Sequence, residues 1–415
     1  MNHSGNISQN IDQDAVLRAR TMLLGSERLD LTEELEAYRI LAEVSPAAYL
    51  PKLVGALLSY GSGASYGHDV ERKLALRAEA LDTARRIDVD HPRRTEVLTD
   101  ALECYGLTLI QSGRRAEGRA AYEEMAAVGR AGFERGQVKH PAYRSGRLAI
   151  VLAEEGRHGE AADLLAQGNR SHRDFFFWSV VEKTAELEAA GRREEAVEVF
   201  TDLVDDTRKE RRQNLLVWEL VHRSRMLDAA GRHGEAGADR WEALSVLTRL
   251  ADPDASERQD GLHSWWSVLH GLSARAVEPD GSPDAPMPAF GNSLFHWSWD
   301  VRTAYFDGIP ALEAEAARLS AAGRLTELAT VRHRLTVRST LMWTDRTHLF
   351  EEPLRPLFDE EVALARRSAE GLSRALADRA MFLLAAGRYE EARADFAEAV
   401  GPLDGADRTP IVTAT

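Results

Sequence analysis

Apolar and small residues recur along the chain around a repeated Gly-Arg dipeptide. The dipeptide occurs six times in nearly the same context, at Gly113, Gly156, Gly191, Gly231, Gly323 and Gly387. A leucine stands four residues before every one of these glycines, and a small residue stands seven before: Gly106, Ala149, Thr184, Ser224, Ala316 and Ala380. Because residues three apart share a helix face, this pattern predicts a helix before each dipeptide.

A second helix is expected after each dipeptide. Glycine permits the left-handed conformation that ends a helix, and the acidic residues that follow suit the start of the next one. Five of the six residues at the fifth position after the glycine are small, which lets two antiparallel helices approach closely. No stretch alternates in the manner of a strand, so we expect an all-α chain.

These helical pairs resemble the tetratricopeptide repeat (TPR) family. The stretch LLAAGRYEEARADFAEAV places Ala392, Phe396 and Ala399 at the packing positions of the family's second helix. Residues 102–125 match as well, and residues 45–61 are similar to the longer-loop variant of actinobacterial TPR proteins. Arg240 and Arg332 depart from the pattern, since they replace the second-helix aromatic residue. The resemblance implies an α-solenoid of antiparallel helix pairs, a TPR-like superhelix whose concave groove binds a partner.

The spacing of the turns divides the chain. We expect a TPR-like array over residues 13–250, an aromatic and proline-rich insert over 251–306 and further TPR-like helices over 307–402, with flexible tails at 1–12 and 403–415. The insert fills the gap of 92 residues between Gly231 and Gly323. Its stretch 277–290 carries four of the 14 prolines, which predicts a loop or a lid.

An aromatic residue stands thirteen positions before three successive turns. In TPR proteins this position on the first helix faces the groove, so the resemblance makes Tyr143, Trp178 and Trp218 candidates for binding a partner, with polar neighbours at Glu182, His222 and Arg225. The alternative is that the rings pack between repeats, as large aromatic residues in helical arrays often do. The positions ten residues before these turns hold Gly146, Val181 and Val221, which cannot form the family's carboxylate clamp, so a helix or an apolar peptide fits better.

The insert has the highest aromatic density in the chain. It forms either an irregular hydrophobic core or a ligand pocket closed by the proline-rich loop, and the candidate pocket residues are His263, Trp265, Trp266, His296, Trp297 and Trp299. The histidines lack carboxylates or thiolates at metal-ligand spacing, so we expect no metal. We expect no cofactor either.

Charge and composition exclude several classes of binding partner and indicate the cellular compartment. The net charge of −15 disfavours nucleic acid and anionic membranes. No apolar run has the length of a membrane span, the first residues lack a secretory signal, and Cys104 is the only cysteine, so we expect a cytoplasmic protein. The glycine-rich stretch 61–67 follows a helical pattern and lacks the lysine of a phosphate loop.

Two functions fit this pattern. The first is a non-catalytic scaffold or regulator that binds a segment of another protein or a peptide in the TPR groove. The second is a sensor in which the aromatic insert binds a small molecule or a signalling peptide. No catalytic motif indicates an enzyme, and the sequence makes no prediction of oligomeric state.

Overall fold

The computed structural model describes residues 13–24, 30–61, 69–167, 176–254, 263–343, 350–368 and 370–401. In these ranges the chain consists of helices and connecting loops without a strand, which confirms the predicted all-α class. The tails predicted at 1–12 and 403–415 lie outside the described residues. The chain forms two compact units that divide within α7 (Gly146–Glu154), between Leu148 and Ala149. The boundaries predicted at 250/251 and 306/307 both fall inside the second unit, unit 2.

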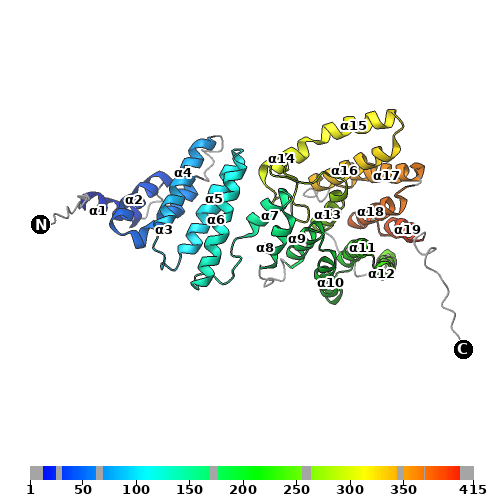
Figure 1. The fold of residues 1–415 in the computed structure, drawn as a ribbon, viewed down its shortest axis with the longest axis horizontal. Helices are drawn as coiled ribbons and strands as arrows, with labels where there is room; N and C mark the ends of the chain where they lie inside the picture. The colour runs from blue at the N-terminus through cyan, green and yellow to red at the C-terminus, as the bar shows by residue number, and fades with distance from the viewer. Residues whose placement is uncertain are drawn as a thin grey trace. The chain divides into compact units, whose positions relative to one another are not determined.

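Unit 1 is a series of helices in which each packs against the next (Figure 1). They are α1 (Gln13–Leu24), α2 (Leu31–Val44), α3 (Pro46–Tyr60), α4 (Val70–Arg85), α5 (Arg94–Gln111) and α6 (Arg115–Glu134). The close approach expected from small residues is present between α5 and α6. A Cβ atom at Gly106 would lie 2.7 Å from the Tyr122 ring, and one at Gly118 would lie 2.6 Å from Ile110. The two helix backbones therefore depend on glycine at these positions.

Unit 2 holds the rest of α7 and the helices that follow it. They are α8 (His158–Ala166), α9 (Phe176–Ala189), α10 (Arg193–Glu210), α11 (Gln213–Ala229), α12 (His233–Ala251), α13 (His263–Gly271), the short 3₁₀ helix η3 (Leu272–Ala276), α14 (Trp299–Asp307), α15 (Ile309–Ala321), α16 (Leu325–Trp343), α17 (Glu351–Ser368), α18 (Leu372–Ala385) and α19 (Tyr389–Val400). Residues 277–298, between η3 and α14, contain no helix. This agrees with the prediction of a loop from the prolines in 277–290.

The Gly-Arg turns have one local structure at all six positions. Each glycine has a positive φ, between 67° and 79°. The following arginine N–H donates to the carbonyl of the leucine five residues earlier, at 2.8–3.0 Å. The glycine N–H donates to the carbonyl three residues before it. Together these bonds form a Schellman motif, which satisfies the last carbonyls of the first helix and explains why the glycine recurs.

The arginine of the turn also contributes to the second helix. Its carbonyl accepts the first bond of that helix, and at five of the six turns its guanidinium pairs with the glutamate three residues on: Glu117, Glu160, Glu195, Glu235 and Glu327. At the sixth turn Arg388 pairs instead with Glu351 on α17. The backbone N–H of the arginine therefore caps the first helix, while at five of the six turns its side chain pairs with a glutamate at the start of the second helix.

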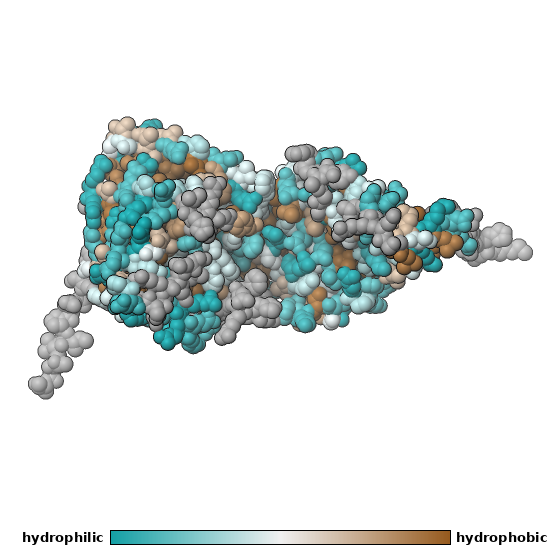
Figure 2. All heavy atoms as spheres, turned by 180° about the vertical axis from the view of Figure 1, so that it is seen from behind, coloured by the Kyte–Doolittle hydropathy of each residue, from teal (hydrophilic) through white to brown (hydrophobic). Residues whose placement is uncertain are grey.

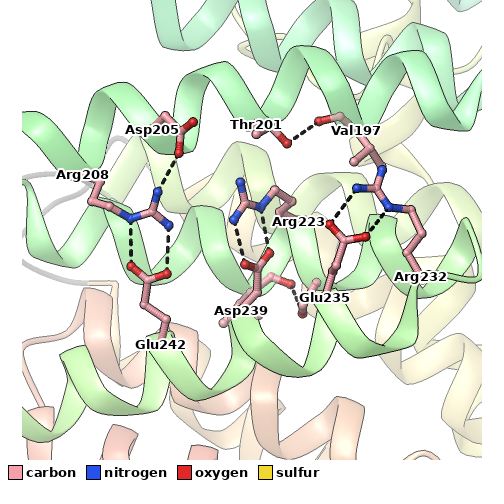
Figure 3. Close-up of polar contacts among 11 residues, drawn as sticks. Val197, Thr201, Asp205, Arg208, Arg223, Arg232, Glu235, Asp239 and Glu242 are labelled. Carbon is pink, nitrogen blue, oxygen red and sulfur yellow. Dashed lines mark hydrogen bonds and ion pairs between the residues drawn. The ribbon is translucent and has the colours of Figure 1, made fainter.

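Ion pairs, one of them buried, connect α10, α11 and α12. Arg223 on α11 makes two 2.7 Å bonds to Asp239 on α12, and these side chains are only 10% and 7% exposed (Figure 3). On the same side, Arg208 of α10 bonds to Asp205 and reaches Glu242 on α12 at 2.8 and 2.9 Å. These contacts fix the register of α10, α11 and α12.

Unit 2 brings helices together that are far apart in the sequence. α12 packs against α19, and α11 packs against α18, while α13 contacts α11, α16 and α18 (Figure 1). The Trp218 indole N–H donates to the Met381 carbonyl at 3.2 Å, although 163 residues separate them. The helix pair before the insert therefore packs directly on the last pair of the chain, with α13 among them.

Candidate functional site

The predicted groove residues fall in both compact units. Tyr143 lies in the turn before α7 and belongs to unit 1, whereas the other five lie on α9 and α11 of unit 2. The Tyr143 carbonyl packs so closely on α6 that a Cβ at Gly129 would lie 2.5 Å from its oxygen, and the Arg144 guanidinium lies 5.8 Å from its ring.

Trp178, at the start of α9, belongs to an aromatic cluster with α13. Its ring lies 5.3 Å from Phe177 and 6.0 Å from Trp265, and Phe177 lies 4.4 Å from Trp265. The structure thus joins a predicted groove residue to a predicted residue of the insert. This cluster connects α9 to α13 within unit 2.

Glu182 of α9 is covered by the insert. The Asn292 side-chain amide donates to the Glu182 carboxyl at 2.6 Å, and a Cβ at Gly291 would lie 2.5 Å from Ala185. Burial raises the pKa of Glu182 to about 7, against the opposing effect of the Asn292 bond. The insert also bonds to Glu154 at the end of α7. The Met287 N–H donates to the Glu154 carbonyl, and the Ser298 N–H donates to the Glu154 carboxylate. The non-helical segment 277–298 therefore lies along α7 and α9.

Trp218 and His222 of α11 are interior residues. They are 3% and 8% exposed, the Trp218 indole bonds to α18, and the His222 ring lies 5.0 Å from Phe200. Burial, with a further effect of Arg225, lowers the pKa of His222 to about 3, so the imidazole is neutral at pH 7. The surroundings of both side chains are those of the packing alternative, and neither ring is open to a partner in this structure.

The insert residues divide among separate clusters. Trp266 is buried beside His270, Phe358 and Phe382. His263 lies 4.5 Å from Phe350. These contacts are those of a hydrophobic core formed with α17 and α18.

The remaining insert candidates lie near α14. The buried Trp297 donates its indole N–H to the Ala289 carbonyl at 3.1 Å and lies beside Tyr305. Trp299 is 51% exposed, with the Arg302 guanidinium 5.1 Å from its ring, and His296 is also exposed. On the face drawn in Figure 2, apolar residues are interspersed among hydrophilic ones.

A cavity of about 570 Å³ lies elsewhere in unit 2, among α11, α12, η3, α16, α18 and α19. Its apolar lining includes Val221, Val277, Ala377, Phe396, Ala399 and Val400. Its charged and hydroxyl lining includes Arg225, Asp228, Arg240, His333, Glu370 and Arg374, with Ser224, Ser273, Thr326 and Thr330 among the hydroxyls. Of the residues predicted for a site, this cavity is lined by Arg225. A much smaller cavity, of about 20 Å³, lies beside it among Trp218, His222, Trp266 and His270.

Two arginines from different helices meet a single carboxylate at the larger cavity. Arg225 of α11 donates to one oxygen of Asp378 at 2.7 Å, and Arg374 of α18 lies 3.5 Å from the other oxygen. Arg374 also lies 3.7 Å from Glu361. Burial alone would raise the pKa of Asp378, but the two guanidiniums more than offset it and hold the pKa well below its ordinary value. The carboxylate is therefore ionised and buried behind the arginines.

A serine, a histidine and a carboxylate also line up at this cavity. Ser273 Oγ lies 3.1 Å from His333 Nε2, and His333 Nδ1 lies 3.2 Å from the Glu361 carboxylate. This order is the one that activates the serine of many hydrolases. However, Ser273 Oγ also lies 2.6 Å from the His270 carbonyl, which can only accept. The shorter distance makes the His270 carbonyl the nearer acceptor for the hydroxyl proton, in competition with His333 Nε2.

The cavity residues that the sequence missed carry little local signal. Arg374 lies in the first turn of α18, where its sequence resembles that of any exposed helix start, and Ser273 lies in the short helix η3 without a nucleophile motif around it. The resemblance gave Phe396 of α19 a packing position. The side chain is buried, and it also lines the cavity. Among the residues that the structure describes, no group of three histidines, cysteines or carboxylates is placed to hold a metal ion.

The comparisons with known proteins assign no family. The chain matches no protein-family model, and no curated protein is similar enough to count as a relative. None of the helices within the described ranges combines the length and the apolar character needed to cross a membrane.

Proposed function

We propose that this chain is a non-catalytic binding protein of TPR-like helix pairs, whose unit 2 takes a small ligand or a short peptide into the cavity of about 570 Å³. The observation that carries the proposal is the cavity itself. Its volume lies within the range of about 300–1,000 Å³ typical of ligand sites, and its mixed apolar and polar lining is also typical of them.

The proposal keeps ligand binding from the sensor hypothesis, but in a cavity that the six aromatic-insert candidates do not line. A partner segment on the inner face of α9 and α11 would have to displace the segment that covers Glu182 and the helix that covers Trp218. The cavity requires no such displacement. Because α11 and α12 come from one half of unit 2 and α18 and α19 from the other, a bound ligand would contact both and stabilise their packing.

The TPR-like character of the pairs is part of the same proposal. It is supported by the Schellman turn that recurs at all six Gly-Arg positions and by the packing of α18 on α19. The proposal of a non-catalytic role is supported by the 2.6 Å contact of Ser273 Oγ with the His270 carbonyl, which competes with His333 for the hydroxyl proton.

A neutral fluorescent probe tests whether the cavity binds ligands. N-phenyl-1-naphthylamine should bind the full chain saturably, with an increase in its emission. Ala377 lines the cavity, so Ala377→Trp should fill it and abolish this binding. The control is Ala322→Trp, at an exposed position at the end of α15, which should bind as the unmodified chain does. Equal binding by a folded Ala377→Trp variant would contradict the proposal.

A further inference from the structure

Resting on the proposed function, we propose that the cavity of unit 2 selects an anionic ligand with an apolar body, whose anionic group is held by Arg225 and Arg374. Arg225 lies on α11 and Arg374 on α18. Their guanidinium nitrogens lie 2.7 and 3.5 Å from the two carboxylate oxygens of Asp378. Asp378 is 3% exposed, whereas the arginine side chains are 35% and 41% exposed. The cations therefore lie on the cavity side and the anion lies behind them.

The arginines retain hydrogen-bonding capacity for a ligand. A guanidinium has five N–H donors. Asp378 takes one short bond from Arg225, while the contacts of Arg374 with Asp378 and Glu361, at 3.5 and 3.7 Å, are longer than good hydrogen bonds. A carboxylate, sulfonate or phosphate group placed between the two guanidiniums would receive shorter, charge-assisted bonds from both.

The start of α18 adds to this preference. Arg374 is the third residue of the helix, where the helix dipole disfavours a cation and favours an anion. The N-cap residue, Gly371, has no side chain to accept from the first N–H groups, and both Gly371 and Ser373 line the cavity. An anion bound here would interact favourably with the helix terminus as well as with the arginines.

An existing ion pair and exposure to solvent weaken the opposing charge of the two acidic residues on the lining. Asp228 is paired with Arg240 at 2.6 Å, and Glu370 is an exposed residue that accepts a bond from Thr326 at 3.4 Å. A cationic ligand would meet Arg225 and Arg374 before it could reach the buried Asp378 and Glu361. The electrostatics of this end of the cavity therefore favour an anion.

The remaining lining suits an apolar body. Part of the cavity lining is apolar and uncharged. It consists of Val221, Val277, Phe396 and Val400. A ligand that combines an anionic group with a hydrophobic portion would satisfy both the arginines and this apolar lining. A small inorganic anion would leave the apolar lining without contacts, so we expect it to bind much more weakly.

A pair of fluorescent probes tests the charge preference. 8-Anilinonaphthalene-1-sulfonate differs from N-phenyl-1-naphthylamine by its sulfonate group, so the two report the contribution of an anion on one ring system. On the full chain the sulfonate probe should bind at least tenfold more tightly than the neutral one. Arg374→Gln should weaken sulfonate binding by roughly tenfold, which corresponds to the loss of one charge-assisted bond, and should leave neutral binding unchanged.

Two further variants separate charge from folding. Arg374→Lys keeps the cation and should retain binding of the sulfonate probe to within a few fold. Arg393→Gln is the matched control, because the Arg393 side chain on α19 has the same 41% exposure and pairs with Glu390, three residues earlier. It should bind both probes as the unmodified chain does, and circular dichroism should show unchanged helicity in all variants.

The outcomes distinguish this inference from the proposed function. If both probes bind with similar affinity, or if Arg374→Gln affects both equally, the anionic preference is overturned while the cavity remains a ligand site. If neither probe binds the unmodified chain, both proposals are overturned. If the sulfonate probe binds preferentially and Arg374→Gln removes only that preference, the inference is supported.

Discussion

The insert segment that covers α9 makes a testable prediction about Glu182. Its carboxyl accepts a 2.6 Å bond from Asn292, and burial raises its pKa from 4.5 to about 7. Between pH 4.5 and 7 the folded state therefore holds a proton that the unfolded state has released. The free energy of unfolding should fall through this range as the pH rises, and the full cost should be present above pH 7.

The magnitude follows from the same shift. A rise of this size corresponds to about 3 kcal/mol for a fully buried group. Because the Glu182 residue keeps partial exposure, we expect about 1–2 kcal/mol. Glu182→Gln keeps the acceptor for Asn292 and cannot ionise, so it should be more stable than the unmodified chain by this amount at pH 8 and equal to it at pH 4.5.

Tryptophan fluorescence suits this assay because all eight tryptophans lie between Trp178 and Trp343, within unit 2. Urea unfolding at pH 4.5, 6 and 8 gives the difference in unfolding free energy at each pH. Glu194→Gln is the control, since Glu194 is 67% exposed and should show no gain that depends on pH. A Glu182→Gln variant that is destabilised at pH 8, or a difference that does not vary with pH, would refute the reasoning.

Three further predictions follow from packing and hydrogen bonding. Asp239→Asn breaks the buried pair with Arg223 and should destabilise unit 2 by about 3 kcal/mol in urea unfolding. Asp205→Asn is the control, because the Asp205 side chain is 50% exposed, and it should cost under about 1 kcal/mol. Equal effects of the two variants would show that burial is not the cause. Gly106→Ala places a Cβ against the Tyr122 ring and should lower the stability of unit 1. Gly55→Ala has open space around the new Cβ in α3 and should raise the stability by up to about 1 kcal/mol. Circular dichroism during heating measures both variants, and a stabilising Gly106→Ala would contradict the close packing of α5 on α6. Ser273 should not react with a fluorophosphonate probe, as followed by intact mass, and labelling that disappears in Ser273→Ala would contradict the non-catalytic role.

The helix pairs could be predicted because their determinants are local. A glycine with positive φ, a leucine four residues before it and a glutamate three residues after the arginine lie within a single turn and its flanking helices. The proline-rich stretch 277–290 was likewise predicted as non-helical, because proline acts on its own neighbourhood. The pairing of the arginine side chain was not predicted in this way, since its direction depends on the helix that follows.

The arrangement of unit 2 could not be predicted from such local signals. The aromatic position of Trp218 suits either a groove or a packed interior, and the contact that decides its surroundings comes from α18, 163 residues later. Similarly, nothing near Glu182 in the sequence indicates Asn292 as its neighbour, 110 residues away. The cavity depends on the same long-range packing, which brings Arg374 to Arg225 across Asp378.

Hydrogen–deuterium exchange with and without saturating 8-anilinonaphthalene-1-sulfonate tests the central claim most directly, because it locates the bound probe along the chain. The account predicts slower exchange in peptides from α11, α16, α18 and α19, which line the cavity, and unchanged exchange in α2 to α6 of unit 1. Protection confined to unit 1, or no protection in α11 and α18, would contradict it.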